Sequence, residues 1–182
     1  MSKGFLIFMF TLTMLLFFKE TIILARSGCL PEKEKDALRE IAESLGKKHL
    51  NPCHEQERPE SPDMPSYNDS IICSSPSADG VCHVESISLK GQDLAGVLPP
   101  SLANLTYLKS IDLTRNYLSG TIPKEWEETK LEYMSLMANR LSGPIPKYLG
   151  NISTLVYMNL ESNRFNGTVP AELGKLVNLK TL

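Results

Sequence analysis

The 182-residue chain lacks the short motifs that mark common catalytic sites. It contains no G-x-x-x-x-G-K-[ST] phosphate loop, and it has neither a His-Arg-Asp nor an Asp-Phe-Gly motif. Glu125, Glu127 and Glu128 are carboxylates on a predicted outer segment, and we interpret them as solvated charge rather than as an acid/base pair. We therefore expect no enzymatic activity and no cofactor in this chain.

The chain also lacks a strong excess of either charge. It has 19 Lys and Arg residues and 21 Asp and Glu residues, which give a formal net charge of −2. No basic block stands out, so the sequence argues against nucleic acid as a partner. Hydrophobic residues make up 42 % of the chain and charged residues 22 %, a composition that allows one domain to bury a core.

Long apolar runs are absent beyond the N-terminus. There, Lys3 precedes an apolar run from Phe5 to Phe18, and the apolar character ends at the small residue Ala25. That order is typical of a signal peptide, so we interpret residues 1–25 as one and expect export. A membrane anchor is the alternative, but the run is shorter than the about 20 residues that a spanning helix needs.

Cysteine is absent from the whole second half of the chain. Cys29, Cys53, Cys73 and Cys82 all precede residue 83, in what export would make an oxidising compartment. Four cysteines allow three pairings, and their spacing does not choose among them. The spacing matches no zinc-finger pattern, so we expect no metal site.

Export also gives meaning to four Asn-x-Ser/Thr triplets, each a possible glycosylation site. We expect glycans on some of Asn68, Asn104, Asn151 and Asn166.

One pattern recurs four times from residue 84 onward, and eight positions are shared by the copies. The copies begin at Val84, Leu108, Leu131 and Leu155, and a fifth begins at Leu179. The pattern is L-x-x-L-x-L-x-x-N-x-L, the leucine-rich repeat. A single repeat cannot bury its own apolar face, so residues 84–182 are predicted to stack into an α/β repeat solenoid with a continuous core.

Each copy is predicted to supply one short strand to a parallel sheet. The strands are expected near 86–88, 110–112, 133–135 and 157–159. Where the chain turns out of each strand, an amide side chain can bond the unpaired backbone of the turn. We therefore expect a ladder along the solenoid, formed by Gln92, Asn116, Asn139 and Asn163.

The Gly-x-Ile-Pro element of each copy carries a resemblance. NYLSGTIP, NRLSGPIP and NRFNGTVP look like the plant-type leucine-rich repeat. Residues 82–182 closely, and 30–53 more loosely, resemble one group of plant receptor-like serine/threonine kinases, in which the repeat ectodomain precedes a malectin-like domain, a membrane helix and a kinase. The resemblance implies a curved solenoid with a second, smaller sheet near the Gly-x-Ile-Pro segments.

Residues 26–83 are predicted to cap the solenoid, because its open end would otherwise expose core. A helix is expected over 31–45, started by Pro31 and stopped by Gly46. Residues 55–80 are rich in Pro, Ser, Asp and Glu and are interpreted as a loop. The apolar face of the helix consists of Ala37, Leu38, Ile41, Ala42 and Leu45.

The resemblance also implies that two cap cysteines form a bridge, here Cys53 with Cys73. In the family a tryptophan commonly precedes the second of these cysteines, but Trp126 is the only tryptophan in this chain. The group often has another cysteine after the Cys73 position, and here serines stand there. Cys82 then lacks its family partner, with Cys29 as a substitute, and the pairing of these two stays open.

Corresponding positions of successive strands are expected to point outward in columns. Tyrosine, methionine and arginine are residue types enriched at interfaces, which makes these columns the candidate binding face. The alternative is a solvated face whose contacts lie in further repeats. The candidate residues are Tyr133, Tyr157, Met137, Arg115, Asp112, Asn159 and Glu161.

By this resemblance the chain is expected to be an ectodomain at the cell surface that binds a peptide, glycan or protein ligand, or a co-receptor ectodomain. The alternative is a self-standing secreted repeat protein, such as an inhibitor of cell-wall-degrading enzymes. The fifth repeat stops after its opening residues, so we expect an incomplete solenoid whose Leu155, Met158 and Leu160 lack a stacked neighbour. The alternative there is that Ala171 to Leu182 folds back as a lid.

Overall fold

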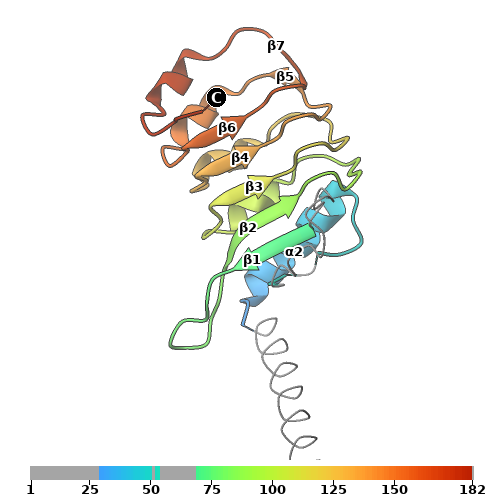
Figure 1. Ribbon diagram of the computed structural model, residues 1–182, viewed down its shortest axis with the longest axis vertical. Helices are drawn as coiled ribbons and strands as arrows, with labels where there is room; N and C mark the ends of the chain where they lie inside the picture. The colour runs from blue at the N-terminus through green and yellow to red at the C-terminus, as the bar shows by residue number, and fades with distance from the viewer. Residues whose placement is uncertain (1–28, 51, 54–68, 182) are drawn as a thin grey trace, which may run out of the picture.

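The computed structural model describes residues 29–50, 52–53 and 69–181. The predicted signal peptide and Asn68 lie outside the described residues. Parallel strands stack along the length of the molecule, one from each repeat, and a helix covers the N-terminal end of the stack (Figure 1). The stack of repeats is the predicted solenoid.

The main sheet has five strands in the order β1-β2-β3-β4-β6. β2, β3, β4 and β6 are parallel, and residues one repeat apart lie side by side, with Ile87 beside Ile111 and Met134 beside Met158. The expected strand positions are therefore confirmed. The strand bounds are β1 Asp69–Cys73, β2 Val84–Leu89, β3 Ser110–Asp112, β4 Tyr133–Ser135 and β6 Tyr157–Asn159.

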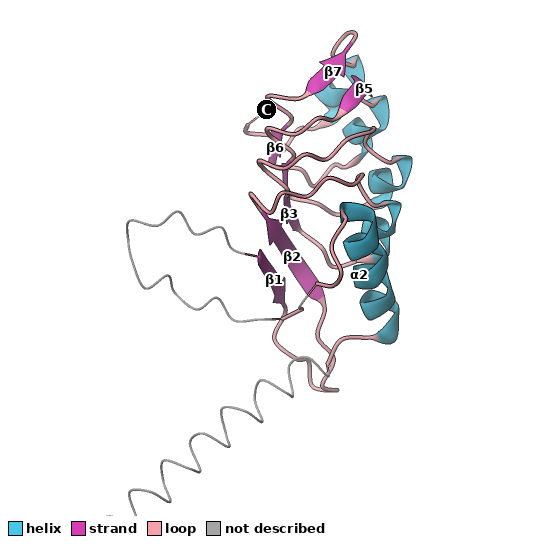
Figure 2. Cartoon of the chain, turned by 90° about the vertical axis from the view of Figure 1, so that its right-hand side faces the viewer, coloured by secondary structure: helices cyan, strands magenta, loops and turns pink. Residues whose placement is uncertain are grey.

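Short 3-10 helices return the chain on the side opposite the main sheet (Figure 2). A proline directly precedes each of them, which suits the start of a helix because proline lacks an N–H and has a fixed φ. Successive helices lie against one another. Their bounds are η1 Pro100–Asn104, η2 Lys124–Glu128, η3 Lys147–Asn151 and η4 Ala171–Lys175.

A second, smaller sheet lies between the main sheet and the short helices (Figure 2). It consists of β5 Ser142–Pro144 and β7 Arg164–Asn166, which are parallel. A parallel bridge between Val97 and Ser119 continues the same arrangement through the earlier repeats. The second sheet implied by the Gly-x-Ile-Pro segments is confirmed.

The core runs unbroken through the repeats because each copy places leucines at the same inward positions. Trp126 replaces leucine at one of these positions in the second repeat. It is completely buried, and its Nε1–H donates to the carbonyl oxygen of Pro99 at 2.8 Å. The indole therefore fills the core without leaving a buried polar atom unpaired.

The asparagines form the expected ladder. The Asn116 side-chain oxygen accepts from Leu94 N–H at 3.1 Å, and its amide nitrogen donates to Leu89 O at 2.9 Å, both in the preceding repeat. Asn139 and Asn163 make the corresponding bonds to the repeats before them. Each asparagine thus completes the turn of the repeat that precedes it.

The cap helix α2, Glu32–Leu45, ends at Gly46, whose φ of +81° suits glycine. It packs against η1, and the segment that precedes η1 lies so close to the end of α2 that a Cβ on Gly96 would lie 1.9 Å from Ser44 O. Buried Glu34 accepts from Val84 N–H at 2.9 Å, and its other oxygen lies 2.6 Å from Nδ1 of His83. These contacts fix the cap to the first repeat.

The interpretation of 55–80 as a loop is wrong for residues 69–73, which form β1, whereas residues 74–80 contain neither helix nor strand. β1 runs antiparallel to β2, with Ile71 opposite Ile87, and Ile71 is fully buried. The strand covers the edge of β2, which would otherwise present unpaired backbone groups. Residues 54–68 lie outside the described part.

Residues 171–181 follow the same path as the preceding repeats. η4 lies against η3, and Thr181 forms a parallel bridge with Tyr157. The segment does not fold back, so the lid alternative is wrong for these residues.

The fourth repeat is better covered than expected. Leu155 and Met158 are completely buried, because Leu173 and Leu176 of the following segment join the same core. The expectation that they lack a neighbour is wrong, whereas Leu160 is half-buried, as are other apolar side chains at that end. Among the described residues, no helix is long and apolar enough to cross a membrane.

Candidate ligand-binding face

The outward side of the main sheet forms a surface that we call the strand face. Ile111, Met134 and Met158 point into the core from the centres of their strands. Because side chains alternate along a strand, the residues on either side of them point outward. The register puts Tyr133 directly beside Tyr157 on this face.

Tyr133 and Tyr157 stack on one another. Their ring centroids are 4.5 Å apart and the ring planes differ by 6°. Burial raises the pKa of the Tyr133 hydroxyl above its usual value, and the negative charge of Asp112 and the presence of Tyr157 raise it further. The Asn159 amide nitrogen donates to the Tyr157 hydroxyl at 3.3 Å. The pair is thus a half-buried, fixed aromatic surface with polar edges.

Asp112 and Asn159 hold the chain where it leaves the strands. An Asp112 oxygen accepts from Thr114 N–H at 2.9 Å, and the Asn159 oxygen accepts from Glu161 N–H at 2.9 Å. The side chain of Glu161 is exposed. These residues therefore lie at the strand ends that lead out of the strand face.

Thr114 shares the column of Met137, and Ser135 shares the column of Asp112, so both were expected to point outward, but both are buried. Thr114 is 7 % exposed and Ser135 is 3 % exposed. Their hydroxyl oxygens are 2.7 Å apart and hydrogen-bond to each other. A hydroxyl side chain is short enough to be covered by its neighbours, and mutual bonding removes the cost of that burial. Some members of the columns therefore point toward solvent, whereas Thr114 and Ser135 are covered by their neighbours.

Arg115 and Met137 stand beside one another at the same edge. Arg115 is exposed and Met137 is half-buried, and Arg115 N–H donates to Met137 O at 2.9 Å. The backbone of Arg115 is left-handed, with a φ of +56°, and Ala138 and Ser162 have φ values of +56° and +57°. Glycine adopts this conformation more readily, and in the first repeat Gly91 occupies the same position with a φ of +64°.

Three of the four candidate glycosylation residues are described, and all three are exposed. Asn104 and Asn151 end η1 and η3, and Asn166 ends β7. None of these positions lies on the main sheet. Glycans there would leave the strand face open.

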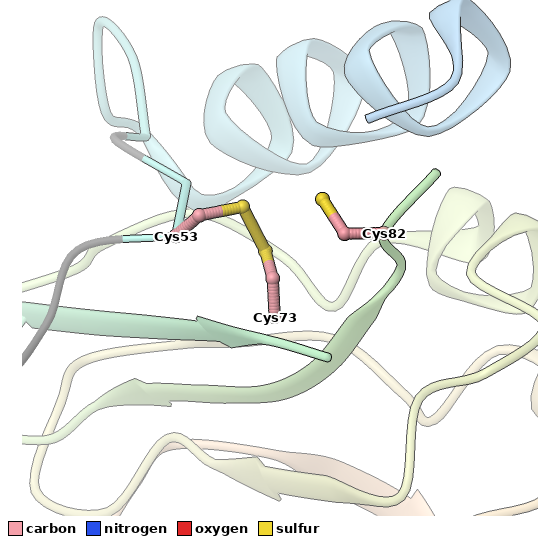
Figure 3. A group of neighbouring side chains, drawn as sticks. All are labelled: Cys53, Cys73 and Cys82. Atoms are coloured by element: carbon pink, nitrogen blue, oxygen red, sulfur yellow. A yellow bond between two sulfur atoms is a disulfide. The ribbon is translucent and has the colours of Figure 1, made fainter. Parts of the chain in front are cut away.

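The sulfur atoms of Cys53, Cys73 and Cys82 lie within 4.8 Å of one another (Figure 3). Cys53 is bonded to Cys73, the pair given by the resemblance, and Cys82 is bonded to Cys29. A metal ligand is a thiolate, whereas these sulfurs are in disulfides. The cluster is therefore two neighbouring bridges of the cap.

A sequence model of the family described as Leucine Rich Repeat matches residues 107–128 and 154–176. One relative, from Arabidopsis thaliana, is named a probable leucine-rich repeat receptor-like serine/threonine-protein kinase and is 40 % identical over 137 residues. A second kinase of the same kind and organism is 39 % identical over 159 residues. These matches cover 71 % and 83 % of this chain, which spans only 13 % and 15 % of the two relatives.

Solved structures show the same fold. The ectodomain of the receptor kinase SOBIR1 from Arabidopsis thaliana has a TM-score of 0.68 and 28 % identity, over 83 % of this chain and 77 % of that one. The BIR3–SERK2 complex from the same organism has a TM-score of 0.64 and 26 % identity, over 80 % and 77 %. The plant peptide hormone receptor RGFR1, in complex with RGF2, has a TM-score of 0.53 and 40 % identity, over 54 % and 16 %.

The stacked repeats, the second sheet and the helical cap define a plant-type leucine-rich-repeat domain with an open strand face. The two relatives given above and SOBIR1 are named as receptor kinases. The chain is similar in sequence to leucine-rich-repeat receptor-like serine/threonine kinases and has the leucine-rich-repeat ectodomain fold of plant receptor kinases. This fold, with its two disulfides, indicates an extracellular location.

Proposed function

We propose that this chain is the ectodomain of a plant receptor-like serine/threonine kinase. It binds an extracellular ligand or a co-receptor, and the kinase acts in signalling at the cell surface. The observation that carries the proposal is the stacked Tyr133–Tyr157 pair on the strand face. Fixed aromatic side chains lose little conformational freedom on binding, which is why they supply much of the binding energy at interfaces.

The proposal extends to the longer gene product. The chain spans 13 % of the first relative, which leaves room for a membrane helix and a kinase domain. The resemblance of residues 82–182 supports the group with a malectin-like domain. The order of residues in 1–25 supports entry into the secretory pathway through a signal peptide.

A peptide is the ligand class that we favour. RGFR1, one of the structural neighbours, is a peptide hormone receptor. The strand face of this chain also suits an extended peptide, because it offers the tyrosine pair on its last two strands, β4 and β6, and polar groups at the strand ends. Those groups include Asp112, Glu161 and Arg115, so a ligand with both charges would find partners.

The test uses the chain secreted from plant cells, with its mature N-terminus determined by mass spectrometry. A random library of 12-residue peptides is selected on the protein, and the enriched peptides are measured against Tyr133→Ala/Tyr157→Ala. We expect affinity to fall by more than about 1 kcal/mol, the usual loss at an interface hot spot. Tyr107→Ala is the control, because Tyr107 is an exposed tyrosine outside the strands of the main sheet.

Circular dichroism must show that the double variant is folded. Unchanged affinity in a folded double variant would place the binding site elsewhere. Equal losses in the double variant and in Tyr107→Ala would also contradict the proposal.

A further inference from the structure

The outer side of the second sheet is a further exposed surface, separate from the strand face. Tyr117, Arg140 and Arg164 occupy the same position in three successive repeats, directly after the ladder asparagines. The next residues, Leu118 and Leu141, are completely buried. Because side chains alternate along an extended segment, Tyr117 and the two arginines point outward, and all three are exposed.

Tyr117 and Arg140 contact one another. The guanidinium carbon of Arg140 lies 4.6 Å from the centre of the Tyr117 ring. A guanidinium stacked in this way is held in place by the ring while its N–H groups stay free to donate at their edges. Arg140 is therefore positioned for a partner before that partner arrives.

The arginines on this side have no acidic partner in the described part of the chain. The salt bridges there join other residues, and none involves Arg115, Arg140 or Arg164. Arg115 is exposed two residues before Tyr117, at the edge where the strand face meets this surface. An anion can bind such guanidinium groups without first breaking an existing ion pair.

The helical side of the repeats carries both signs of charge, because Lys124, Lys147 and Lys175 lie on η2, η3 and η4. The chain as a whole has a net charge of −2. Glu125, Glu127 and Glu128 lie on η2, on the helical side, and Glu172 lies on η4. On the second sheet, the first repeat has the exposed acid Asp93 at the position of Arg140 and Arg164, so the positive charge of the two arginines is local to the third and fourth repeats.

We propose that the basic flank, defined as Arg115, Tyr117, Arg140 and Arg164, docks an acidic segment of a protein partner. Guanidinium groups bind carboxylates through paired N–H donors, and successive repeats offer one such group after another. Val97, 49 % exposed, lies in the part of this sheet formed by the first repeat and adds apolar contact area. A sugar would stack on an open aromatic ring, but Arg140 already covers one face of Tyr117, so a protein fits better than an acidic polysaccharide.

The probe is a fluorescent peptide of ten glutamates, and binding is measured by anisotropy at low and at physiological salt. Arg140→Glu/Arg164→Glu should weaken binding by about tenfold or more, because each reversal replaces an attraction by a repulsion. The matched control is Lys147→Glu/Lys175→Glu, which makes the same charge change in the same two repeats on exposed residues of η3 and η4. The control should bind within about twofold of the unmodified protein.

Asn166 follows Arg164 on β7, so both double variants and their reference carry Asn166→Gln to keep a glycan out of the comparison. Tyr117→Ala should weaken binding about threefold, whereas Tyr117→Phe, which keeps the ring, should restore it. Absence of binding to the unmodified protein, or equal loss in the control, would overturn the proposal. Binding of oligogalacturonate at the flank without binding of the peptide would also overturn it and assign the site to a polysaccharide.

Discussion

Trp126 is the residue on which the second repeat depends most. It fills the position that a leucine fills in the other repeats, and it is completely buried. Trp126→Ala should lower the free energy of unfolding by about 3–5 kcal/mol, because it leaves a large cavity. Urea unfolding followed by circular dichroism measures the change, since the variant has no tryptophan to report fluorescence.

Trp126→Phe distinguishes the stability contributed by the packing of the ring from that contributed by its hydrogen bond. It keeps most of the apolar contact but leaves Pro99 O without its donor, so we expect a smaller loss of about 1–3 kcal/mol. Val177→Ala is the control, because Val177 is 85 % exposed. An alanine variant as stable as the control would show that the core does not depend on the indole.

The tyrosine pair predicts an effect of alkaline pH. A tyrosine hydroxyl is neutral when protonated, and the pKa of Tyr133 is raised in the folded protein. The stability that this contributes is fully present below the unfolded pKa of about 10 and is lost as the pH rises through the folded pKa. The urea midpoint should therefore fall above pH 10, and Tyr133→Phe should reduce that fall.

Absorbance at 295 nm follows the ionisation directly. Burial also raises the pKa of the Tyr148 hydroxyl. Tyr148→Phe is therefore measured beside Tyr133→Phe, so that the two hydroxyls with raised pKa values can be told apart. The titration lost in Tyr133→Phe is that of the Tyr133 hydroxyl, and if it is centred at the usual tyrosine pKa of about 10, the half-buried, stacked arrangement of Tyr133 is wrong.

At the scale of elements, the short helices η3 and η4 depend on a glycine. A Cβ on Gly150 would lie 2.2 Å from Glu172 O, a backbone atom that cannot move without moving η4. Gly150→Ala should therefore destabilise the fourth repeat by at least about 1–3 kcal/mol, the usual cost of overpacking. Hydrogen exchange over residues 155–176 should increase.

Gly174→Ala is the matched control. Gly174 occupies the same position one repeat later, and its Cβ would meet nothing within 4 Å. The two substitutions are chemically identical, so a difference between them measures the contact of η3 with η4. Equal effects would show that the helices do not approach as closely as described.

The elements differ in how well the sequence predicts them. The strands of the repeats were predictable, because Leu108, Leu131 and Leu155 recur at a nearly constant spacing. β1 was not, because its Ile71 and Ile72 stand outside the repeat, next to a stretch rich in Pro, Ser and acidic residues. Its pairing with β2 is a tertiary contact that no local pattern encodes.

The strand face shows the same division. Its tyrosine pair follows from the repeat register. The burial of Thr114 and Ser135 depends on neighbouring side chains in space, which an alignment of the repeat sequences does not show. The basic flank was missed although a signal was present. At the position after the ladder residue, the four copies have Asp93, Tyr117, Arg140 and Arg164, so the last two copies both have a base there.

At the scale of the whole molecule, the two disulfides hold the cap on the solenoid. The Cys29–Cys82 bridge closes a separation of 53 residues and Cys53–Cys73 one of 20. In the chain-entropy account these separations correspond to about 4 and about 3 kcal/mol. Cys29→Ser/Cys82→Ser should therefore lower the urea midpoint more than Cys53→Ser/Cys73→Ser does.

Peptide mapping without reduction establishes the pairs before the variants are compared. A Cys53–Cys82 or Cys53–Cys29 peptide would refute the assignment. With the pairs established, a larger loss from Cys53→Ser/Cys73→Ser would mean that strain or residual structure outweighs the length of the closed loop.

The asparagine ladder also bears on how such a molecule changes its length over generations. Asn116, Asn139 and Asn163 each make the same bonds to the preceding repeat, so every junction between repeats is chemically equivalent. If one whole repeat were duplicated or lost in a gene, the new junction between repeats would have the same hydrogen bonds as the existing junctions. The second repeat is one residue shorter than the others, and the ladder bonds on both sides of it, made by Asn116 and Asn139, are preserved. Unequal recombination can thus lengthen or shorten the binding surface in whole repeats, without a new solution for the core.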